Sequence, residues 1–233
     1  MLNVGRVDCA VSMSNDYYTR RTTQLLIQFD EMATRLTEIL TRYYGFNLAD
    51  SIMKESRREY ENLIPDLPYI GGDDNSRLTA IMIFSGHSLA LYRAMKRHGR
   101  TAEEIGRIIY ENAETQLKNN PQQPRQQGQQ MLTEELQKRL KEHAKKSQQR
   151  TYSYDWVFSF VEGDGKEFDF GFDYTECGIC KFYKSQGAEE LTPYLCLLDY
   201  PKYKALGIQL TRTKTIADGA GICDFRFKKS QLI

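Results

Sequence analysis

The sequence lacks the features that mark several large classes of protein. Its 233 residues carry 32 Lys and Arg against 31 Asp and Glu, so no excess of one sign attracts nucleic acid or an anionic membrane. Apolar runs such as Ile81 to Phe84 are far shorter than the roughly 18 to 20 residues of a membrane helix. We therefore expect a protein that binds neither nucleic acid nor membrane.

Signals for targeting and for common cofactors are also missing. The N-terminal MLNVGRVD has neither a basic stretch nor a continuous apolar core, which argues against a cleaved secretion signal and favours a cytoplasmic protein. The chain contains no phosphate-binding Walker loop, dinucleotide glycine fingerprint or HExxH motif, so we expect no cofactor. Histidine is scarce, and His87 lies among apolar neighbours, which favours a packed side chain over a general base.

Cysteine is present in an arrangement that does not suit disulfides. The chain has five cysteines, an odd number, and four of them fall in the last third: Cys177, Cys180, Cys196 and Cys223. In a reducing compartment such thiols are core residues, metal ligands or catalytic groups. With 40% apolar and 27% charged residues, the chain can fold by burial, and its length fits one medium domain with an appendage.

Apolar residues recur every three or four positions from about residue 14 to residue 147, which predicts helices. The first helix carries Leu25 to Tyr43 and ends at Gly45, and its apolar face suits either core packing or a homodimer contact. Further helices are expected over 48–63, from residue 75 or 76 to 98, and from 101 through 117. Thr101 and Glu104 have the spacing of a capping box, which makes that boundary the most secure.

Residues 119–130 change in composition to Pro, Gln and Gly, which predicts a connector. We expect a helical region over 1–118, the connector over 119–130, and a sheet region over 131–233 that forms one integrated domain with 76–118. Leu132, Leu136 and Leu140 repeat at four and predict a thin amphipathic helix at the start of the last region.

The hydrophobic period then changes from helical to strand-like. Aromatic residues alternate over 152–160 and again over 168–174, with a turn at 162–165, which predicts a hairpin. A second hairpin should join 208–216 to 222–227, with Cys223 and Phe225 on one face and Asp224 and Arg226 on the other. The predicted fold class is α+β, with a helical N-terminal half packed on a mainly antiparallel sheet of about four strands.

The cysteine spacing leaves two interpretations open besides catalysis. Cys177-x2-Cys180 followed by Cys196-x2-Asp199 has the spacing of two pairs of zinc ligands. Aspartate in place of the fourth thiolate and the apolar neighbours of Cys196 weaken this reading, so we expect no metal. The simplest alternative is that two or three of these thiols are buried in the core.

A catalytic interpretation requires a cation or a helix N-terminus that favours a thiolate, with an acid and a base nearby. Cys196, with Asp199 one helical turn on, would supply such a set if it faced Arg212, Asp224 and Arg226. The alternative for Asp224 and Arg226 is an ion pair at the surface or with the helices.

These residues give the last two thirds of the chain a family resemblance. The elements that carry it are Leu89-Ala90-Leu91-Tyr92-Arg93-Ala94-Met95 before Gly99, Tyr174-x2-Cys177, Leu191-x-Pro193-x2-Cys196-x2-Asp199, Arg212-Thr213-x-Thr215-Ile216-Ala217-x-Gly219 and Cys223-Asp224-Phe225-Arg226-Phe227. With these elements, residues 76 to 228 resemble the L-2-amino-thiazoline-4-carboxylic acid hydrolase family, and the end of the chain is also similar to small-molecule-binding domains of the vinyl-reductase type.

The resemblance implies a hydrolase that opens a small cyclic amidine or isothiourea, such as 2-aminothiazoline-4-carboxylate, by carbon–nitrogen cleavage to an N-carbamoyl amino acid. It implies a small-molecule substrate as the partner. The implied site residues are Cys196, Asp199 and Asp224 for catalysis, and Tyr174, Cys177, Arg212, Cys223 and Arg226 for substrate binding.

Within that set the resemblance implies separate roles. Cys196 is the nucleophile or a hydrogen-bonding thiol, and Asp199 and Asp224 recognise the amidine and transfer protons. Arg212 or Arg226 holds the substrate carboxylate. The alternative from another class is a non-catalytic module that binds a small molecule between the aromatic faces of the two hairpins.

Overall fold

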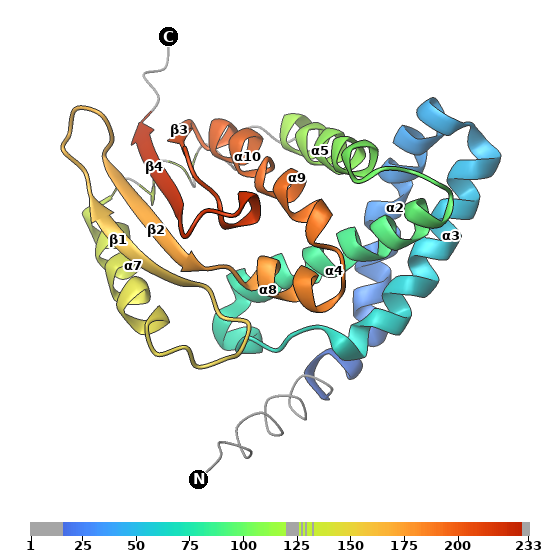
Figure 1. Ribbon diagram of the computed structural model, residues 1–233, viewed down its shortest axis with the longest axis horizontal. Coiled ribbons are helices and arrows are strands. Elements are labelled where there is room, and N and C mark those ends of the chain that lie inside the picture. The colour runs from blue at the N-terminus through green and yellow to red at the C-terminus, as the bar shows by residue number, and fades with distance from the viewer. Residues whose placement is uncertain (1–15, 120–125, 127, 129, 132, 230–233) are drawn as a thin grey trace. The chain divides into compact units, whose positions relative to one another are not determined.

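The computed structural model describes residues 16–119, 126, 128, 130–131 and 133–229 (Figure 1). The chain forms two compact units. What we call the helical unit comprises the described residues up to Asn112 together with Tyr152–Tyr154 and Lys181–Leu191, and the other described residues form the sheet unit. Most of the connector expected over 119–130 lies outside the described residues. Within them, no helix is long and apolar enough to cross a membrane.

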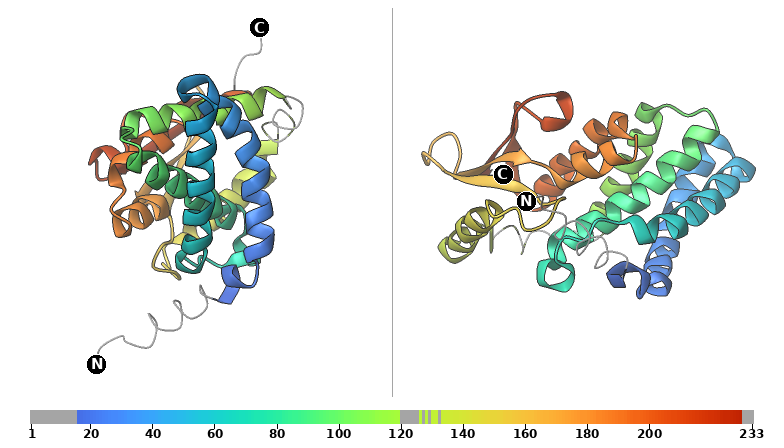
Figure 2. Two further views of the ribbon diagram at one scale, coloured as in Figure 1. Left: turned by 90° about the vertical axis from the view of Figure 1, so that its right-hand side faces the viewer. Right: turned by 60° about the horizontal axis from the view of Figure 1, so that its bottom comes forward.

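The helices expected from the periodicity are confirmed. They are α2 (Thr22–Tyr44), α3 (Phe46–Leu63), α4 (Ser76–Arg97) and α5 (Ala102–Asn119), with short 3-10 turns η1 (Ile64–Asp66) and η2 (Gly72–Asn75). Gly45, at φ +80°, makes the turn after which α3 runs back beside α2 (Figures 1 and 2). The capping box before α5 forms in both directions, since Thr101 N–H donates to Glu104 and Glu104 N–H to Thr101 Oγ1.

Helix α4 is buried around most of its circumference because small residues let neighbouring elements approach closely. A Cβ on Gly86 would lie 2.7 Å from Leu67 Cδ2 and 3.2 Å from the Tyr60 ring. Beside it, His87 is 7% exposed and meets the Tyr60 ring edge-on with ring centroids 4.3 Å apart. Burial lowers the pKa of His87 to about 4, and its Nε2 has no hydrogen-bond partner among the described residues.

The sheet unit contains four antiparallel strands in the order β1-β2-β4-β3. The strands are β1 (Val157–Glu162), β2 (Phe170–Glu176), β3 (Ile208–Thr211) and β4 (Cys223–Lys229), so both expected hairpins are present. The helices of the last third are α7 (Glu134–Ser147), α8 (Gly178–Ser185), α9 (Thr192–Cys196) and α10 (Asp199–Ala205), with η3 (Glu189–Leu191) and η4 (Ile216–Asp218).

Two predicted strand boundaries were wrong. The strand expected over 152–160 begins only at Val157, because Tyr152–Tyr154 belong to the helical unit, where the Tyr152 ring meets Tyr69 edge-on at 5.4 Å. The strand expected over 208–216 ends at Thr211. Beyond it, the backbone N–H groups of Thr213 and Lys214 donate to the Asp224 carboxylate, so they do not donate to a neighbouring strand.

One face of the sheet carries the aromatic core. Phe158 pairs across strands with Tyr174, and Phe172 with Phe160 and Phe225, as the alternation predicted. Helix α7 packs on β1 and α10 on β3 (Figure 1). The buried members of this core are Leu140, Ala144, Phe158, Phe170, Phe172, Tyr203, Leu206, Ile208 and Phe227. Leu136 and Leu140 of the predicted amphipathic helix pack there, whereas Leu132 lies outside the described residues.

Candidate functional site

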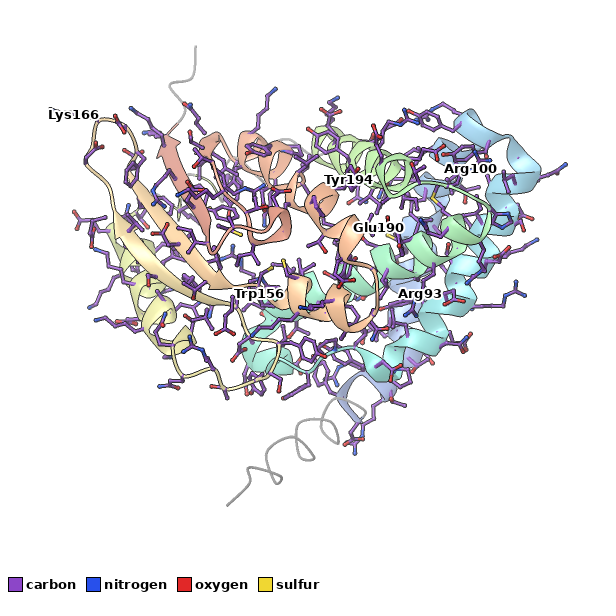
Figure 3. The ribbon with its side chains drawn as sticks, viewed as in Figure 1. Arg93, Arg100, Trp156, Lys166, Glu190 and Tyr194 are labelled. Atoms are coloured by element: carbon purple, nitrogen blue, oxygen red, sulfur yellow. The ribbon has the colours of Figure 1, made fainter. Side chains whose placement is uncertain are left out.

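The first part of the site forms where β2 passes into α8. Cys177 stands directly between the two elements, and Cys180 lies in the first turn of the helix. The Cys177 sulfur accepts hydrogen bonds from the Cys180 thiol, from the N–H groups of Ile179 and Cys180, and from the indole of Trp156. Trp156, only 8% exposed, lies beside the start of α8 (Figure 3). A sulfur surrounded by donors at a helix N-terminus is in the environment that favours a thiolate.

The pKa values of these two thiols move in opposite directions. The hydrogen bond from Cys180 is the main cause that lowers the pKa of Cys177, and the two N–H groups and the Trp156 indole add to it against the opposing effect of burial. The pKa of Cys180 is raised, because its thiol donates to Cys177 and because it is buried beside that charge. Of the two thiols, that of Cys177 is therefore the first to ionise.

The second part of the site is built around Arg212, which follows β3. Its Nη1 donates to Asp199 Oδ2 and its Nη2 to the Cys196 carbonyl, both at 2.8 Å. The Arg212 side chain is only 3% exposed, while that of Asp199 is 29% exposed. The guanidinium lies 4.8 Å from the centre of the Phe225 ring. Its Nε has no hydrogen-bond partner among the described residues.

Arg212 keeps its charge in this buried position, whereas Cys196 does not acquire one. Burial disfavours the guanidinium, but the effects of Asp199, Cys196 and Tyr200 together outweigh it, so the pKa of Arg212 is raised. For Cys196, burial and the negative charges of Cys177 and Asp199 raise the pKa, and the opposing effect of Arg212 is smaller than their sum. At neutral pH Cys196 is therefore a protonated thiol.

Cys223 completes the group of thiols from β4. It is 6% exposed, its sulfur accepts the Ile216 N–H at 3.1 Å, and burial raises its pKa. The charge of Cys177 contributes to the raised pKa of both Cys196 and Cys223, so the thiols are electrostatic neighbours. Among the described residues, no three His, Cys, Asp or Glu side chains are arranged to hold a metal ion.

Two of the residues named from the sequence stand on the opposite face of the sheet. The Asp224 carboxylate accepts the N–H groups of Thr213 at 2.9 Å and Lys214 at 2.6 Å. It also accepts the Thr213 hydroxyl at 2.6 Å, and these bonds lower its pKa although partial burial opposes them. Arg226 pairs with Asp173 at 2.8 Å, so the two residues do not pair with each other. The Asp224 carboxylate therefore holds the loop after β3, and the Arg226 guanidinium binds a side chain of β2.

The structure therefore divides the sequence-predicted residues into two sets. Cys177, Cys196, Asp199, Arg212 and Cys223 come together on the core side of β4, whereas Asp224 and Arg226 lie on its other side. Tyr174 belongs to the first set by position, since its ring lies in the aromatic face, 5.3 Å from that of Phe225.

Sequence reasoning missed the role of Trp156. Its aromatic ring fitted the strand alternation, and nothing in the spacing shows that its indole reaches a thiol twenty-one residues later. A usable signal was present at Cys177, because a cysteine directly before a predicted helix is in reach of that helix's unpaired N–H groups.

Comparison with known proteins adds the family. Residues 80–227 match the family model described as L-2-amino-thiazoline-4-carboxylic acid hydrolase, which is more than half of the chain and includes every site residue above. No curated protein matches the chain. The chain belongs to the L-2-amino-thiazoline-4-carboxylic acid hydrolase family.

Proposed function

We propose that this protein hydrolyses a small cyclic amidine or isothiourea that carries a carboxylate, such as 2-aminothiazoline-4-carboxylate. The observation that carries the proposal is a thiol surrounded by hydrogen-bond donors, Cys177, in the same unit as the buried Arg212–Asp199 pair. Together they offer a nucleophile, a cation for a carboxylate and an anion for an amidinium. Membership of the family supports the choice of substrate class.

The chemistry of the product decides which bond opens. An N-carbamoyl amino acid keeps both nitrogens on the former amidine carbon, so neither carbon–nitrogen bond to that carbon has broken. For a thiazoline the bond that opens is the ring carbon–sulfur bond, which releases the cysteine thiol. Carbon–nitrogen cleavage in the ring, which we expected from the sequence, would give an S-carbamoyl product instead.

In the first half of the proposed reaction, the Cys177 thiolate adds to the amidine carbon of the bound amidinium. The ring carbon–sulfur bond breaks, and the departing sulfur takes a proton from the Cys196 thiol. The opened substrate stays attached to Cys177 as an isothiouronium. Cys196 suits this role because its raised pKa keeps the thiol protonated at neutral pH, so it has a proton to give to the departing sulfur.

In the second half, water adds to the same carbon and gives one proton to the Cys196 thiolate. The carbon–sulfur bond to Cys177 then breaks, a second proton passes to solvent, and the urea group of the product remains. One water is consumed, and both thiols return to their starting protonation states. This pathway assigns nucleophilic attack to Cys177 and proton transfer to Cys196.

The Arg212–Asp199 pair is assigned to binding. The Nε–H of Arg212 has no hydrogen-bond partner among the described residues, and it suits a substrate carboxylate. Asp199, which is more exposed than Arg212, suits the amidinium. Asp224 and Arg226 are left out of this proposal, because their bonds hold the opposite face of the sheet.

The test is an assay of the purified full chain with 2-aminothiazoline-4-carboxylate, in which thiol release and product mass are followed. We expect turnover that falls at least about a hundredfold in Cys177→Ser and is unchanged in the matched control Cys9→Ser. Rapid quenching should show Cys177 carrying the mass of one intact substrate. Ligand binding without product would contradict the proposal and favour a non-catalytic binding module.

A further inference from the structure

Cys177 and Cys180 are placed as a pair in a way that the other thiols are not. They are three residues apart across the first turn of α8, and their two sulfurs are joined by a hydrogen bond. Both residues are half-buried and free of any disulfide. Two sulfurs already in contact on one helical turn can be bridged with little movement of the backbone.

The two thiols are also unequal, which suits sequential thiol–disulfide exchange. Cys177 receives hydrogen bonds from the helix N–H groups and from Trp156, whereas Cys180 donates one. Exchange needs a thiolate to attack and a second thiol close by to resolve the mixed disulfide. Cys177 fits the first role, and Cys180 is the thiol in contact with it.

We propose that Cys177 and Cys180 form a redox-active dithiol, which a low-molecular-weight disulfide such as oxidised glutathione converts to an intrachain disulfide. In the first step the Cys177 thiolate attacks one sulfur of the reagent, forming a mixed disulfide and releasing one glutathione thiolate. In the second step Cys180 loses its proton to solvent or to that thiolate and attacks the Cys177 sulfur, which releases the second glutathione. The protein loses two electrons and two protons, and the reagent gains both.

The disulfide has a consequence for the reaction proposed above, and this part rests on the proposed function. Oxidation ties up the Cys177 sulfur, so it can no longer attack an amidine carbon. Cys196 and Cys223 remain as thiols in either state, because their pKa values are raised and Cys223 is also buried. The dithiol would therefore act as a reversible redox switch on hydrolysis.

The experiment equilibrates the full chain with glutathione buffers of graded ratio, blocks free thiols and identifies each cysteine by peptide mass spectrometry. We expect a loss of two hydrogens and a Cys177–Cys180 crosslink, reversed by dithiothreitol. Cys180→Ser should accumulate a glutathione adduct at Cys177, and Cys177→Ser should form none at Cys180. Cys196→Ser should leave the crosslink unchanged.

Two results would overturn the proposal. One is a crosslink that joins Cys196 or Cys223 instead, and the other is a Cys177 thiol that stays reduced in oxidised glutathione while Cys180→Ser gains no adduct. Hydrolysis is measured on the same samples. If the crosslink forms but the reduced protein has no hydrolase activity, the dithiol proposal stands and the proposed function fails. If the reduced protein is active and no crosslink forms, the proposed function stands and the dithiol proposal fails.

Discussion

The two thiol environments of the sheet unit differ in a way that runs against a simple electrostatic expectation. Cys196 lies beside the cation Arg212, yet its pKa is raised, whereas Cys177 is surrounded by neutral donors and has its pKa lowered. The guanidinium of Arg212 is already committed to Asp199 and to the Cys196 carbonyl. Burial is the main cause that raises the pKa of Cys196, and the lowering effect of Arg212 is smaller than the raising effects together. At Cys177, the hydrogen-bond donors outweigh the effect of burial.

The helical unit shows what burial does to a basic group that has no carboxylate partner. His87 is buried between the rings of Tyr60 and Phe29, and burial alone lowers its pKa to about 4. The Arg212 side chain is only 3% exposed but retains its charge, because Asp199 is bound to it. The comparison therefore separates the effect of burial from the effect of the partner.

The largest expected effect is on stability in acid. His87 is neutral in the folded protein down to about pH 4, but it ionises near its ordinary pKa of about 6.5 when unfolded. Its contribution is thus fully present above about pH 6.5 and is lost as the pH falls toward 4, by about 3 kcal/mol in total. Chemical denaturation from pH 7 to pH 4 measures this. His87→Gln should have a flatter profile, and an unchanged slope would show that His87 is not responsible.

The second prediction removes the partner of Arg212. Asp199→Asn should lower the free energy of unfolding by about 2 kcal/mol, because a buried guanidinium loses its counter-charge. It should also lower the pKa of Cys196, since Asp199 raises it. The matched control is Asp173→Asn in the more exposed pair with Arg226, where we expect less than about 1 kcal/mol. Equal losses of unfolding free energy in the two variants would contradict the claim that burial makes Arg212 more dependent on its partner than Arg226.

The third prediction weakens the donors around Cys177. Trp156→Phe keeps an aromatic ring but removes the indole N–H, so the pKa of Cys177 should rise. Alkylation of Cys177 near neutral pH should then slow several-fold, up to about tenfold. Circular dichroism checks that the sheet unit remains folded. Unchanged alkylation would mean that the helix N–H groups and Cys180 are sufficient without the indole.

The smallest effect is expected on the opposite face of the sheet. Asp224→Asn keeps the shape of the side chain but weakens the bonds to Thr213 and Lys214, which should cost about 1 kcal/mol of stability. The alkylation rate of Cys177 should not change. A large loss of hydrolysis at unchanged stability would instead place Asp224 in the chemistry, as the family resemblance had implied.

Where the sequence contained local signals, it predicted the fold well. Thr101 and Glu104 located the start of α5, because a capping box is made by residues only three positions apart. The alternation of Phe170, Phe172 and Tyr174 identified the buried face of β2 for the same reason. Tyr152 and Tyr154 continued the alternation but are not in the strand, because their contacts are with distant residues of the helical unit.

The candidate site was predictable only in part. The proximity of Cys196, Asp199 and Arg212 matched the expectation, since α9, α10 and β3 follow one another closely in the chain. The advantage of Cys177 over Cys196 could not be read from spacing, because it depends on Trp156 and on which donors reach the sulfur. The alternation along β4 already contained the separation of Asp224 from Cys223, although the catalytic hypothesis combined them.

The most direct test of this account is substoichiometric alkylation with iodoacetamide between pH 5 and pH 10, with the labelling rate of each cysteine read by peptide mass spectrometry. The account predicts that Cys177 is labelled first and that its rate has a midpoint below the ordinary thiol pKa of about 8.5, while Cys180, Cys196 and Cys223 react only at higher pH. Faster labelling of Cys196 or Cys223, or one common rate for all four thiols, would contradict it.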